Sequence, residues 1–548
     1  MNDRITVRDA TFAVLRERGV DRIFANPGST EISFLTDLPD DLEFVLGLHE
    51  GSVVGMATGH AIATGRPAFV NLHTTAGLGN AVGALATARV NRAPLVVVVG
   101  QQDRNHLSLE PFLAGQLAGL AGSYPVWTNE PVLPADVPGA IRRACHEAAQ
   151  YRGPALVVVP MDDWLAEVDP ARDQVSPLAL VRAGSDPAPV LDDLAAVIGQ
   201  ARRPVIVAGA GSADQASWDG LVRLAERLGV QVWQEAFGAC AGFPQDHPNF
   251  AGHLPSNRSA LREAVRDNDL ILVVGTSAFR QYAYEPGPLV PAGVTVAVVS
   301  DDPDDLHHSR ADLAVLGSPA SVCAALADRL PHRGVRPPPR VVARVEPPQD
   351  GEEMRAAHVF AALAARLPRD AVVVEETPST RSDLHELIPA RMPRGFVSAA
   401  MGGLGFALPA ATGLRMGDPS RGVVALLGDG SSLYAIQGLW SAARYGCGVL
   451  FVVLSNGRYA VMDQLADNVG GKAPWPAFED ISIAGLARSL NCPAVEIRSY
   501  SDLLSCLDEV VPSLAERTGP LLLEITVATD SGSTKRLPAE PAGKNTEA

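Results

Sequence analysis

The stretch "LLGDGSSLYAIQGLWSAARYGCGVLFVVLSNGRY", residues 426–459, contains two apolar strand patterns, each ending in a polar turn. The first run ends at Asp429 and the second at Asn456, with a tryptophan-bearing helical segment between them. Two strands joined by a helix are expected to lie parallel, so their carboxyl ends meet at one edge of a sheet. The stretch therefore predicts an α/β fold with a carboxylate and an amide at that edge.

Short Val/Ile-rich runs alternate with Ala/Leu/Arg-rich helical segments along the whole chain, as in parallel sheets covered by helices on both faces. We expect an α/β protein with three doubly wound parallel-sheet domains. The predicted strands lie in three groups: 66–72, 93–100 and 153–160; 203–211, 269–275 and 294–300; 370–376, 421–430 and 448–456.

Two Pro-rich, aperiodic segments predict linkers between these domains. They span residues 175–189 and 331–353. Beyond residue 530 the chain has almost no hydrophobic residues, which favours a disordered tail. The predicted domains are therefore 1–175, 190–330 and 354–530, followed by a tail at 531–548.

Composition excludes several classes of partner. The 548 residues carry a formal charge of −17 without a Lys/Arg cluster, which argues against nucleic acid. No apolar run approaches the roughly 18 residues needed to span a bilayer, and the N-terminal segment predicts a charged amphipathic helix rather than a signal peptide. The scattered cysteines suggest buried thiols in a reducing compartment, so we expect a cytoplasmic protein. They are Cys145, Cys240, Cys323, Cys447, Cys492 and Cys506.

The GDG turn at residues 428–430 is suited to binding a phosphate and a cation. It leads into a helix expected to start at Ser431, whose free N–H groups would suit a phosphate. Asp429 can hold a hard cation, and the Asn456 amide oxygen can add a ligand to the same ion. The two turns together therefore suit a magnesium diphosphate, although a GDG sequence alone also occurs in plain strand-to-helix turns.

This pairing resembles the thiamine diphosphate motif, in which GDG is followed after about two dozen residues by NN; here Ser455 replaces the first Asn. Residues 1–527 resemble the pyruvate-decarboxylase/acetolactate-synthase group, and within it the benzoylformate decarboxylases. The segments that carry the resemblance, besides the metal motif, are "NPGSTEISFL", "LHEGSVVGMATGHA", "RPAFVNLHTTAGLGNAVGAL" and "AMGGLGFALPAATG".

The resemblance implies pyrimidine-binding, central and diphosphate-binding domains, in that order. It also implies a homodimer or homotetramer, with each active site between the first domain of one subunit and the last domain of another. The implied metal ligands are Asp429, Asn456 and the backbone carbonyl of Arg458. Further implied cofactor contacts are the Gly402 carbonyl, Leu404 between the two cofactor rings, Gly428, Gly430, Ser431 and Tyr459.

Glu50 begins a helical segment directly after an apolar run, where a carboxylate needs a partner. The resemblance implies that Glu50 hydrogen-bonds N1′ of the aminopyrimidine and activates the cofactor. A helix N-terminal acid that only complements the helix dipole is the alternative.

His73 follows a predicted buried strand, at the end of a parallel strand where ligands bind. The resemblance implies that His73 and Ser29 handle the substrate; a histidine there can also simply pack or cap a turn. Residues implied to line the substrate pocket are Phe112, Leu113, Tyr282, Met462 and Leu465.

The implied reaction is thiamine diphosphate- and Mg²⁺-dependent decarboxylation of a 2-oxo acid through an enamine. An apolar pocket would favour loss of CO₂, because charge disappears in that step. A carboligase that passes the enamine to an aldehyde, and a non-catalytic homologue, are the alternatives. Benzoylformate decarboxylases carry a second catalytic histidine where Tyr282 stands here, so we expect slower protonation and weak benzoylformate activity; a role of Tyr282 in pocket shape alone is the other interpretation.

Overall fold

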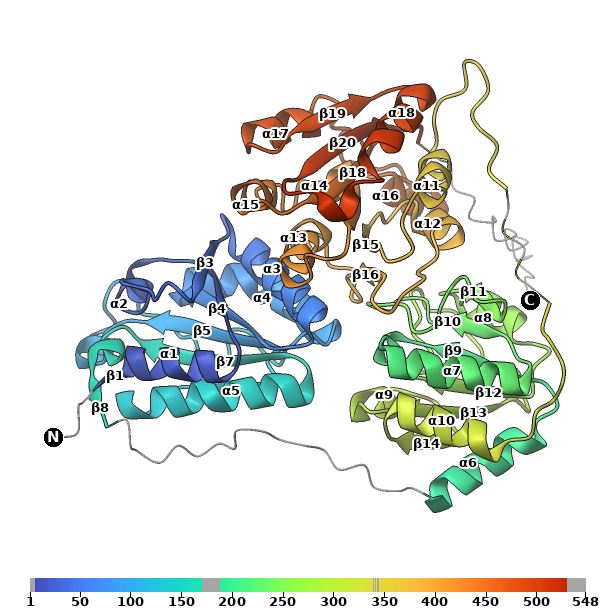
Figure 1. Ribbon diagram of the computed structural model, residues 1–548, viewed down its shortest axis with the longest axis horizontal. Helices are drawn as coiled ribbons and strands as arrows, with labels where there is room; N and C mark the ends of the chain where they lie inside the picture. Colours follow the sequence, from blue (N-terminus) through green and yellow to red (C-terminus); the bar gives the residue numbers. More distant parts are fainter. Residues whose placement is uncertain (1–4, 170–187, 339, 341, 343, 530–548) are drawn as a thin grey trace, which may run out of the picture.

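Three six-stranded sheets, each with all its neighbouring strands parallel, form the molecule (Figure 1). The computed structural model describes residues 5–169, 188–338, 340, 342 and 344–529. The predicted fold class is confirmed. The predicted tail 531–548 and residues 175–187 of the first predicted linker lie outside the described residues.

The first sheet has the strand order β3 (Glu43–Leu46), β2 (Arg22–Asn26), β4 (Ala68–His73), β5 (Leu95–Gln101), β7 (Pro154–Pro160) and β6 (Trp127–Asn129). Helices α1 (Val7–Glu17) and α5 (Val137–Tyr151) pack on one face. Helices α3 (Glu50–Thr64) and α4 (Thr74–Val90) pack on the other. The remaining elements are α2 (Ile32–Leu35), the antiparallel pair β1 (Ile5–Thr6) and β8 (Glu167–Val168), and 3₁₀ turns at Ser29–Glu31, Arg104–Leu109, Pro134–Asp136 and Asp163–Leu165.

The central sheet has the order β11 (Phe250–His253), β10 (Val232–Gln234), β9 (Pro204–Ala208), β12 (Leu270–Val274), β13 (Thr295–Ser300) and β14 (Leu313–Leu316). Its helices are α6 (Ala188–Gln200), α7 (Gln215–Leu228), α8 (Arg258–Ala264), α9 (Pro303–His307) and α10 (Pro319–Arg329), with a 3₁₀ turn at Ala210–Ser212. Since α6 begins at Ala188, the last two residues of the first predicted linker are helical. The described residues of 331–353 form no helix or strand, as expected for a linker.

The third sheet has the order β16 (Phe396–Ser398), β15 (Val372–Glu376), β17 (Val423–Gly428), β18 (Val449–Ser455), β20 (Leu521–Thr526) and β19 (Ala494–Ile497). Its helices are α11 (Ala356–Ala364), α12 (Arg381–Leu387), α13 (Ala407–Gly417), α14 (Asp429–Ser432), α15 (Gly438–Arg444), α16 (Ala460–Asn468), α17 (Ile483–Ser489) and α18 (Tyr500–Val510), with a 3₁₀ turn at Leu514–Glu516. The helix predicted to start at Ser431 starts instead at Asp429 and has four residues, because the extended backbone of Gly428 makes that residue the N-cap.

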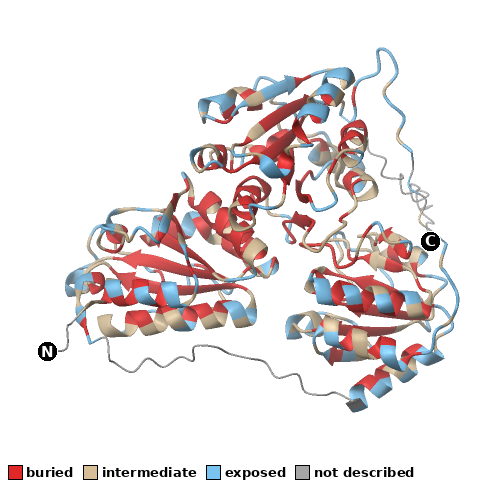
Figure 2. Ribbon diagram, in the orientation of Figure 1, coloured by how far each residue is buried: buried red, intermediate tan, exposed pale blue. Residues whose placement is uncertain are grey.

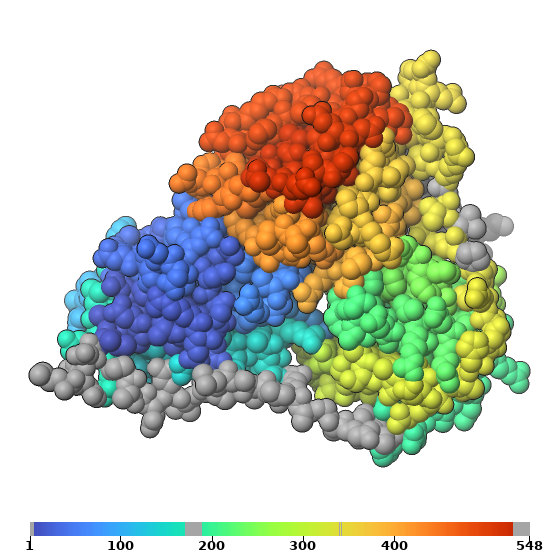
Figure 3. Space-filling view, in the orientation of Figure 1, coloured from blue at the N-terminus to red at the C-terminus, as the bar shows by residue number. Residues whose placement is uncertain are grey.

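The first and third domains share one continuous hydrophobic core in which α3 packs directly on α13. A Cβ atom on Gly59 would lie 2.0 Å from the Ala410 carbonyl oxygen, and one on Gly413 would lie 1.8 Å from that of Met56. Only glycine lets the helices approach this closely. Figure 3 shows the two domains in direct contact, and Figure 2 shows that the sheet strands are largely buried.

All six cysteines are free, and five of them are buried. Cys506 is half-buried, so the expectation of buried thiols holds for the other five. Among the described residues, no helix is both long and apolar enough to cross a membrane.

Candidate active site

Asp429 joins the ends of two adjacent strands. Strands β17 and β18 pair in register, with Gly428 opposite Leu454, so the GDG turn and Asn456 meet at one sheet edge. One carboxylate oxygen of Asp429 accepts hydrogen bonds from the Asn456 and Gly457 backbone N–H groups, at 2.8 and 2.6 Å. Burial raises the pKa of Asp429, and these hydrogen bonds oppose that rise. The two predicted metal-site turns are therefore in contact.

Asn456 and Arg458 belong to the same turn. The Asn456 amide oxygen accepts a hydrogen bond from the Arg458 backbone N–H at 3.1 Å, and the Arg458 guanidinium pairs with Asp463 at 3.1 Å. Among the described residues no three His, Cys, Asp or Glu side chains form a metal-binding group. One carboxylate with amide and carbonyl oxygens nevertheless fits a Mg²⁺ ion that takes its other ligands from phosphate and water.

Gly430 makes room for Tyr459. A Cβ atom on Gly430 would lie 2.6 Å from the Tyr459 ring and 3.2 Å from Phe478. The two rings pack against each other with centroids 5.0 Å apart. Of the other predicted cofactor contacts in this turn, Gly428 is half-buried and Ser431 is buried.

The loop that carries Gly402 and Leu404 is anchored at both ends. Before it, Ala400 accepts a hydrogen bond on its carbonyl oxygen from Arg280 at 2.8 Å and donates its N–H to the Asn91 amide oxygen at 2.9 Å. Gly402 has a φ of +74°, and the position of a Cβ atom there has no neighbouring atom within 4 Å. Open space beside a backbone held in this way fits the close approach of a planar ring.

Glu376 holds the other end of this loop, a role that the sequence analysis missed. Its carboxylate accepts hydrogen bonds from the backbone N–H groups of Gly405, Phe406 and Ala407, between 2.7 and 2.8 Å. Burial raises the pKa of Glu376 to about 7, even though these N–H groups stabilise the ionised form. Glu376 ends the predicted strand 370–376, and a carboxylate at the end of a parallel strand could have been identified from the sequence as a candidate site residue.

The residues that follow β15 also reach the Asp429 edge, because β15 pairs with β17. Ser379 accepts a hydrogen bond from the Val461 backbone N–H at 3.1 Å, which ties this segment to α16. Thr377 donates its N–H to Glu375 at 2.7 Å. These hydroxyl-bearing residues are further candidates for contacts with a diphosphate.

Glu50 is buried at the start of α3, where the side chain of His49 caps the helix by accepting from the Gly51 N–H. The Asn26 and Asn80 side-chain amides each donate to one Glu50 carboxylate oxygen at 3.0 Å. The carboxylate therefore has two neutral partners, and neither was identified from the sequence. These two hydrogen bonds fix the orientation of the Glu50 carboxylate, which a role as a partner of the helix dipole alone does not require.

Ser29 and His73 lie at the same edge of the first sheet, because β2 and β4 are neighbours. Ser29 is exposed and begins the 3₁₀ turn Ser29–Glu31. The His73 Nδ1 atom lies 3.0 Å from the buried carboxylate of Glu31, another residue that the sequence analysis missed. The structure thus brings a histidine, a carboxylate and a hydroxyl-bearing turn to one sheet edge.

The predicted pocket residues lie on three separate segments. Phe112 and Leu113 belong to the loop after β5, and the Phe112 side chain is 87% exposed. Tyr282 is 70% exposed on a central-domain loop. Met462, 43% exposed, and the half-buried Leu465 lie on α16.

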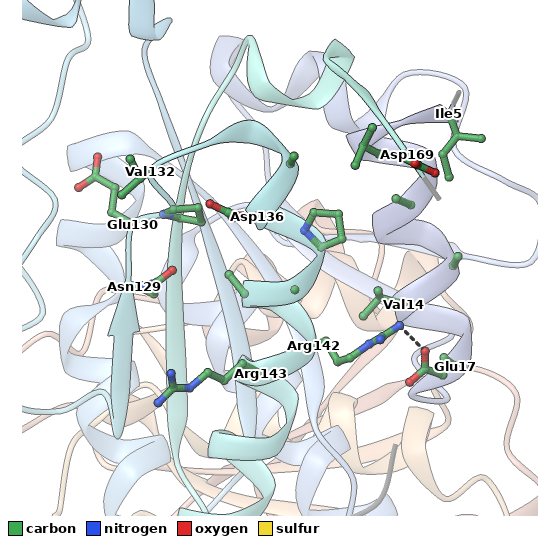
Figure 4. A pocket seen from close by; sticks show the side chains of 18 of the residues that line it. Ile5, Val14, Glu17, Asn129, Glu130, Val132, Asp136, Arg142, Arg143 and Asp169 are labelled. Carbon is green, nitrogen blue, oxygen red and sulfur yellow. Dashed lines mark hydrogen bonds and ion pairs between the residues drawn. The ribbon is translucent and has the colours of Figure 1, made fainter. Parts of the chain in front are cut away.

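A large cavity of about 570 Å³ lies elsewhere, between α1, α5 and the segment around β6 (Figure 4). Glu17 and Arg142, which form an ion pair of 2.6 Å, belong to its wall. None of the predicted site residues lines it, and α1 and α5 cover the sheet face opposite α3 and α4. The strand ends, rather than this cavity, hold the candidate chemistry.

Three family models match the chain in sequence order: the N-terminal, central and C-terminal domains of thiamine pyrophosphate enzymes, over residues 5–119, 191–326 and 379–525. The chain belongs to the thiamine pyrophosphate enzyme family. The matches to the first and last domains are described as thiamine pyrophosphate binding, and they include Glu50 and Asp429 respectively.

Relatives within this family match nearly the whole chain. Benzoylformate decarboxylase from Pseudomonas aeruginosa is 37% identical, with 96% of this chain and 99% of the relative covered. The structure of a thiamine diphosphate-dependent 4-hydroxybenzoylformate decarboxylase from Rhodococcus jostii RHA1 has a TM-score of 0.90 and 34% identity, and the match covers 96% of this chain and all of that one. The structure of benzoylformate decarboxylase from Polynucleobacter necessarius has a TM-score of 0.89 and 31% identity, with 96% and 99% covered.

Proposed function

We propose that the protein is a thiamine diphosphate- and Mg²⁺-dependent decarboxylase of a 2-oxo acid. The observation that carries this proposal is the contact between Asp429 and the Asn456 turn; the open space at the Gly402 backbone agrees with it. The names of the relatives suggest benzoylformate and 4-hydroxybenzoylformate as the first substrates to test. When bound, thiamine diphosphate supplies a carbon nucleophile that adds to the substrate carbonyl and accepts the electrons released as CO₂ leaves.

Residues of the third domain would hold the cofactor. Asp429, Asn456 and the Arg458 carbonyl would ligate the Mg²⁺ ion, while Gly402 and Leu404 would contact the cofactor rings. The predicted contacts at Gly428, Gly430, Ser431 and Tyr459 stay part of this proposal. In each case the support is the position of the residue at the carboxyl edge of the third sheet or on the adjoining loops.

Residues of the first domain would handle protons and substrate. Glu50, held by Asn26 and Asn80, would keep a proton on one carboxylate oxygen for the aminopyrimidine. His73 would exchange a proton at its Nε2 atom, and Ser29 would bind the substrate carboxylate through its hydroxyl. The pocket proposed for Phe112, Leu113, Tyr282, Met462 and Leu465 would exclude water, which favours loss of charge.

The proposed assembly is a homodimer or homotetramer with active sites between subunits. The exposure of Phe112, Tyr282 and Met462 in a single chain supports it, because large apolar side chains at a site need covering. The proposed domains remain 1–175, 190–330 and 354–530. The free cysteines support a reducing, cytoplasmic location.

Mixing two inactive variants tests where the sites lie. If each site joins two subunits, a hybrid of a Glu50→Ala chain and an Asp429→Ala chain contains one intact site, so activity returns on mixing. A site built within one chain gives no recovery, provided that mass spectrometry shows the hybrid. Each variant alone is the control.

The reaction is tested by incubating the purified protein, thiamine diphosphate and Mg²⁺ with a panel of 2-oxo acids, with and without an aldehyde, and identifying the products. Release of CO₂ and the matching aldehyde supports decarboxylation. A 2-hydroxy ketone as the main product supports a carboligase, the second candidate, which the presence of Tyr282 in place of a histidine favours. No turnover with any 2-oxo acid, despite cofactor binding, would indicate a non-catalytic homologue.

A further inference from the structure

Glu31 and Thr30 surround one nitrogen of His73. The His73 Nδ1 atom lies 3.0 Å from a carboxylate oxygen of Glu31 and 3.0 Å from the Thr30 hydroxyl oxygen. The Thr30 hydroxyl donates to the other Glu31 carboxylate oxygen, and the Gly28 backbone N–H donates to Glu31 at 2.7 Å. The Glu31 side chain is only 1% exposed, so this carboxylate takes its partners from the protein.

The hydrogen-bond pattern decides which His73 nitrogen carries a proton. An ionised carboxylate only accepts hydrogen bonds, and a hydroxyl has a single proton to donate. The Thr30 proton is already directed at Glu31, so both oxygens beside Nδ1 act as acceptors. Nδ1 must then be the donor, which leaves Nε2 of the neutral ring with a free lone pair.

The ionised state of Glu31 is supported by its donors. Burial is the larger effect and raises the pKa of Glu31 above its ordinary value, whereas the hydrogen bonds from Thr30 and Gly28 and the nearby His73 favour the ionised form and limit that rise. Glu31 is the ionisable group in hydrogen-bond contact with His73. Three glycines of neighbouring segments also lie against the pair: Gly28 and Gly77 against His73, and Gly100 against Glu31.

Two of these glycines leave the space that the pair occupies. A Cβ atom on Gly28 would lie 2.4 Å from the His73 ring, and one on Gly100 would lie 1.9 Å from a Glu31 carboxylate oxygen. Both residues come from other segments than α4, which His73 caps. A side chain at either position would displace His73 or Glu31. Glycine at both positions therefore leaves the space in which these two side chains meet.

We propose that Glu31 is a positioning residue for the decarboxylase reaction: it fixes His73 with Nδ1 protonated, so that Nε2 exchanges the proton with the substrate. This inference rests on the proposed function. When Nε2 takes up a proton from a hydronium ion of the solvent, the O–H bond breaks with its electrons left on water, an N–H bond forms with the ring lone pair, and the Glu31 charge stabilises the imidazolium. When Nε2 gives the proton to the carbon that has lost CO₂, the ring returns to the Nδ1–H form.

The first experiment compares Glu31→Gln with the wild type in the complete enzyme. Glutamine keeps the shape but removes the negative charge, so imidazolium forms less readily. We expect kcat to fall on the order of 10- to 100-fold, the loss typical when the partner of a metal-bound histidine is removed. The alkaline limb of the kcat–pH profile should move to lower pH by about one unit, while KM for the cofactor stays unchanged.

Glu31→Asp and Asp163→Asn are the matching variants. Aspartate restores the charge at a shorter reach, so it should return the pH profile toward that of the wild type. Asp163 is also a buried first-domain carboxylate, but it pairs with Arg104 at 2.6 Å and lies outside the proposed site. Asp163→Asn should therefore leave kcat and its pH profile unchanged.

The second experiment observes the ring directly and does not depend on turnover. Histidine ¹⁵N chemical shifts identify which nitrogen is protonated, and the His73 signals are assigned by their loss in His73→Asn. We expect the Nδ1–H form in the wild type and a mixture of both tautomers in Glu31→Gln. An Nε2–H form in the wild type, or an unchanged pH profile in Glu31→Gln, overturns the inference. Absence of turnover in the wild type instead refutes the proposed function. In that case the His73 tautomer still shows whether Glu31 holds Nδ1 in its protonated form.

Discussion

The carboxylate of Asp429 accepts a hydrogen bond of 2.8 Å from the backbone N–H of Asn456. This bond links the ends of β17 and β18, which are separated in sequence by α14 and α15. The other carboxylate oxygen, Oδ1, accepts a hydrogen bond from the Gly430 N–H at 2.7 Å and has a second lone pair that can ligate a cation. One residue thus fixes the geometry of the proposed metal site and supplies its charge.

Replacement of Asp429 by Ala should abolish retention of thiamine diphosphate and the dependence on Mg²⁺. The diphosphate and the ion would lose a buried charged partner, a change that typically costs about 3–5 kcal/mol, or more than about 100-fold in affinity. Isothermal titration calorimetry measures the loss. Circular dichroism should show that the variant stays folded, because the core around β17 is untouched.

Asp463→Ala is the control for this prediction, since Asp463 pairs with Arg458 beside the site without being a proposed ligand. Its cofactor affinity should stay within a few-fold of the wild type. Unchanged cofactor affinity in Asp429→Ala would refute the proposed metal ligand.

Glu50→Gln should still bind the cofactor but lose turnover by about 100-fold or more. Glutamine fits the space between Asn26 and Asn80, whereas it cannot exchange a proton with the aminopyrimidine. The measurement is the rate of exchange of the cofactor C2 proton, followed by NMR after quenching. An exchange rate equal to that of the wild type would show that Glu50 has no such role.

The contacts of Glu50 illustrate what the sequence could and could not predict. The local motif identified Asp429 and Asn456, because both follow long apolar runs. Asn26 and Asn80 meet Glu50 only through the pairing of distant segments, which no spacing reveals.

The strands were also only partly predictable from the sequence. All nine predicted runs are buried strands, but nine further strands of the three sheets were missed: the interior strands β2, β10 and β20, and the six edge strands β3, β6, β11, β14, β16 and β19. The edge strands have three or four residues, and one such as β19 is partly exposed, so it lacks a continuous apolar run.

A pair of buried histidines predicts how stability depends on pH. The rings of His253 on β11 and His385 on α12 stack with centroids 3.8 Å apart, between the central and third domains. Burial and the charges of Arg340 and Arg381 lower the pKa of His253 to about 3. Burial, together with His253 and the same arginines, lowers the pKa of His385 well below its ordinary value.

Both rings therefore stay neutral in the folded protein while the unfolded chain takes up protons below about pH 6.5. Stability is fully present above that pH and falls as the pH is lowered toward 3. At pH 5 the loss is about 2 kcal/mol for His253, and His385 adds to it in the same direction.

His385→Phe should reduce this loss, because phenylalanine keeps the stacked ring and cannot take up a proton. Differential scanning calorimetry at pH 7 and pH 5 should show a smaller drop in Tm than in the wild type. The exposed His332→Phe is the control and should behave as the wild type. An equal drop in His385→Phe and the wild type would contradict the prediction.

Tyr282 provides the test of product choice. Two residues before it, Arg280 donates a hydrogen bond of 2.8 Å to the Ala400 carbonyl, so the Tyr282 segment is tied to the loop that carries Gly402. At neutral pH a phenol releases its proton far less readily than an imidazolium. Protonation of the carbon that has lost CO₂ should therefore be slow, which leaves time for attack on an aldehyde.

Replacement of Tyr282 by His should accordingly lower the ratio of carboligation to decarboxylation and speed the turnover of benzoylformate. The measurement is chromatographic quantification of both products from benzoylformate in the presence of an aldehyde. Tyr284→His is a matched control: Tyr284 is a neighbouring tyrosine, 82% exposed, whose ring lies against Arg258. If Tyr282→His leaves the product ratio unchanged while the wild type decarboxylates benzoylformate rapidly, Tyr282 only shapes the pocket and the protonation argument fails.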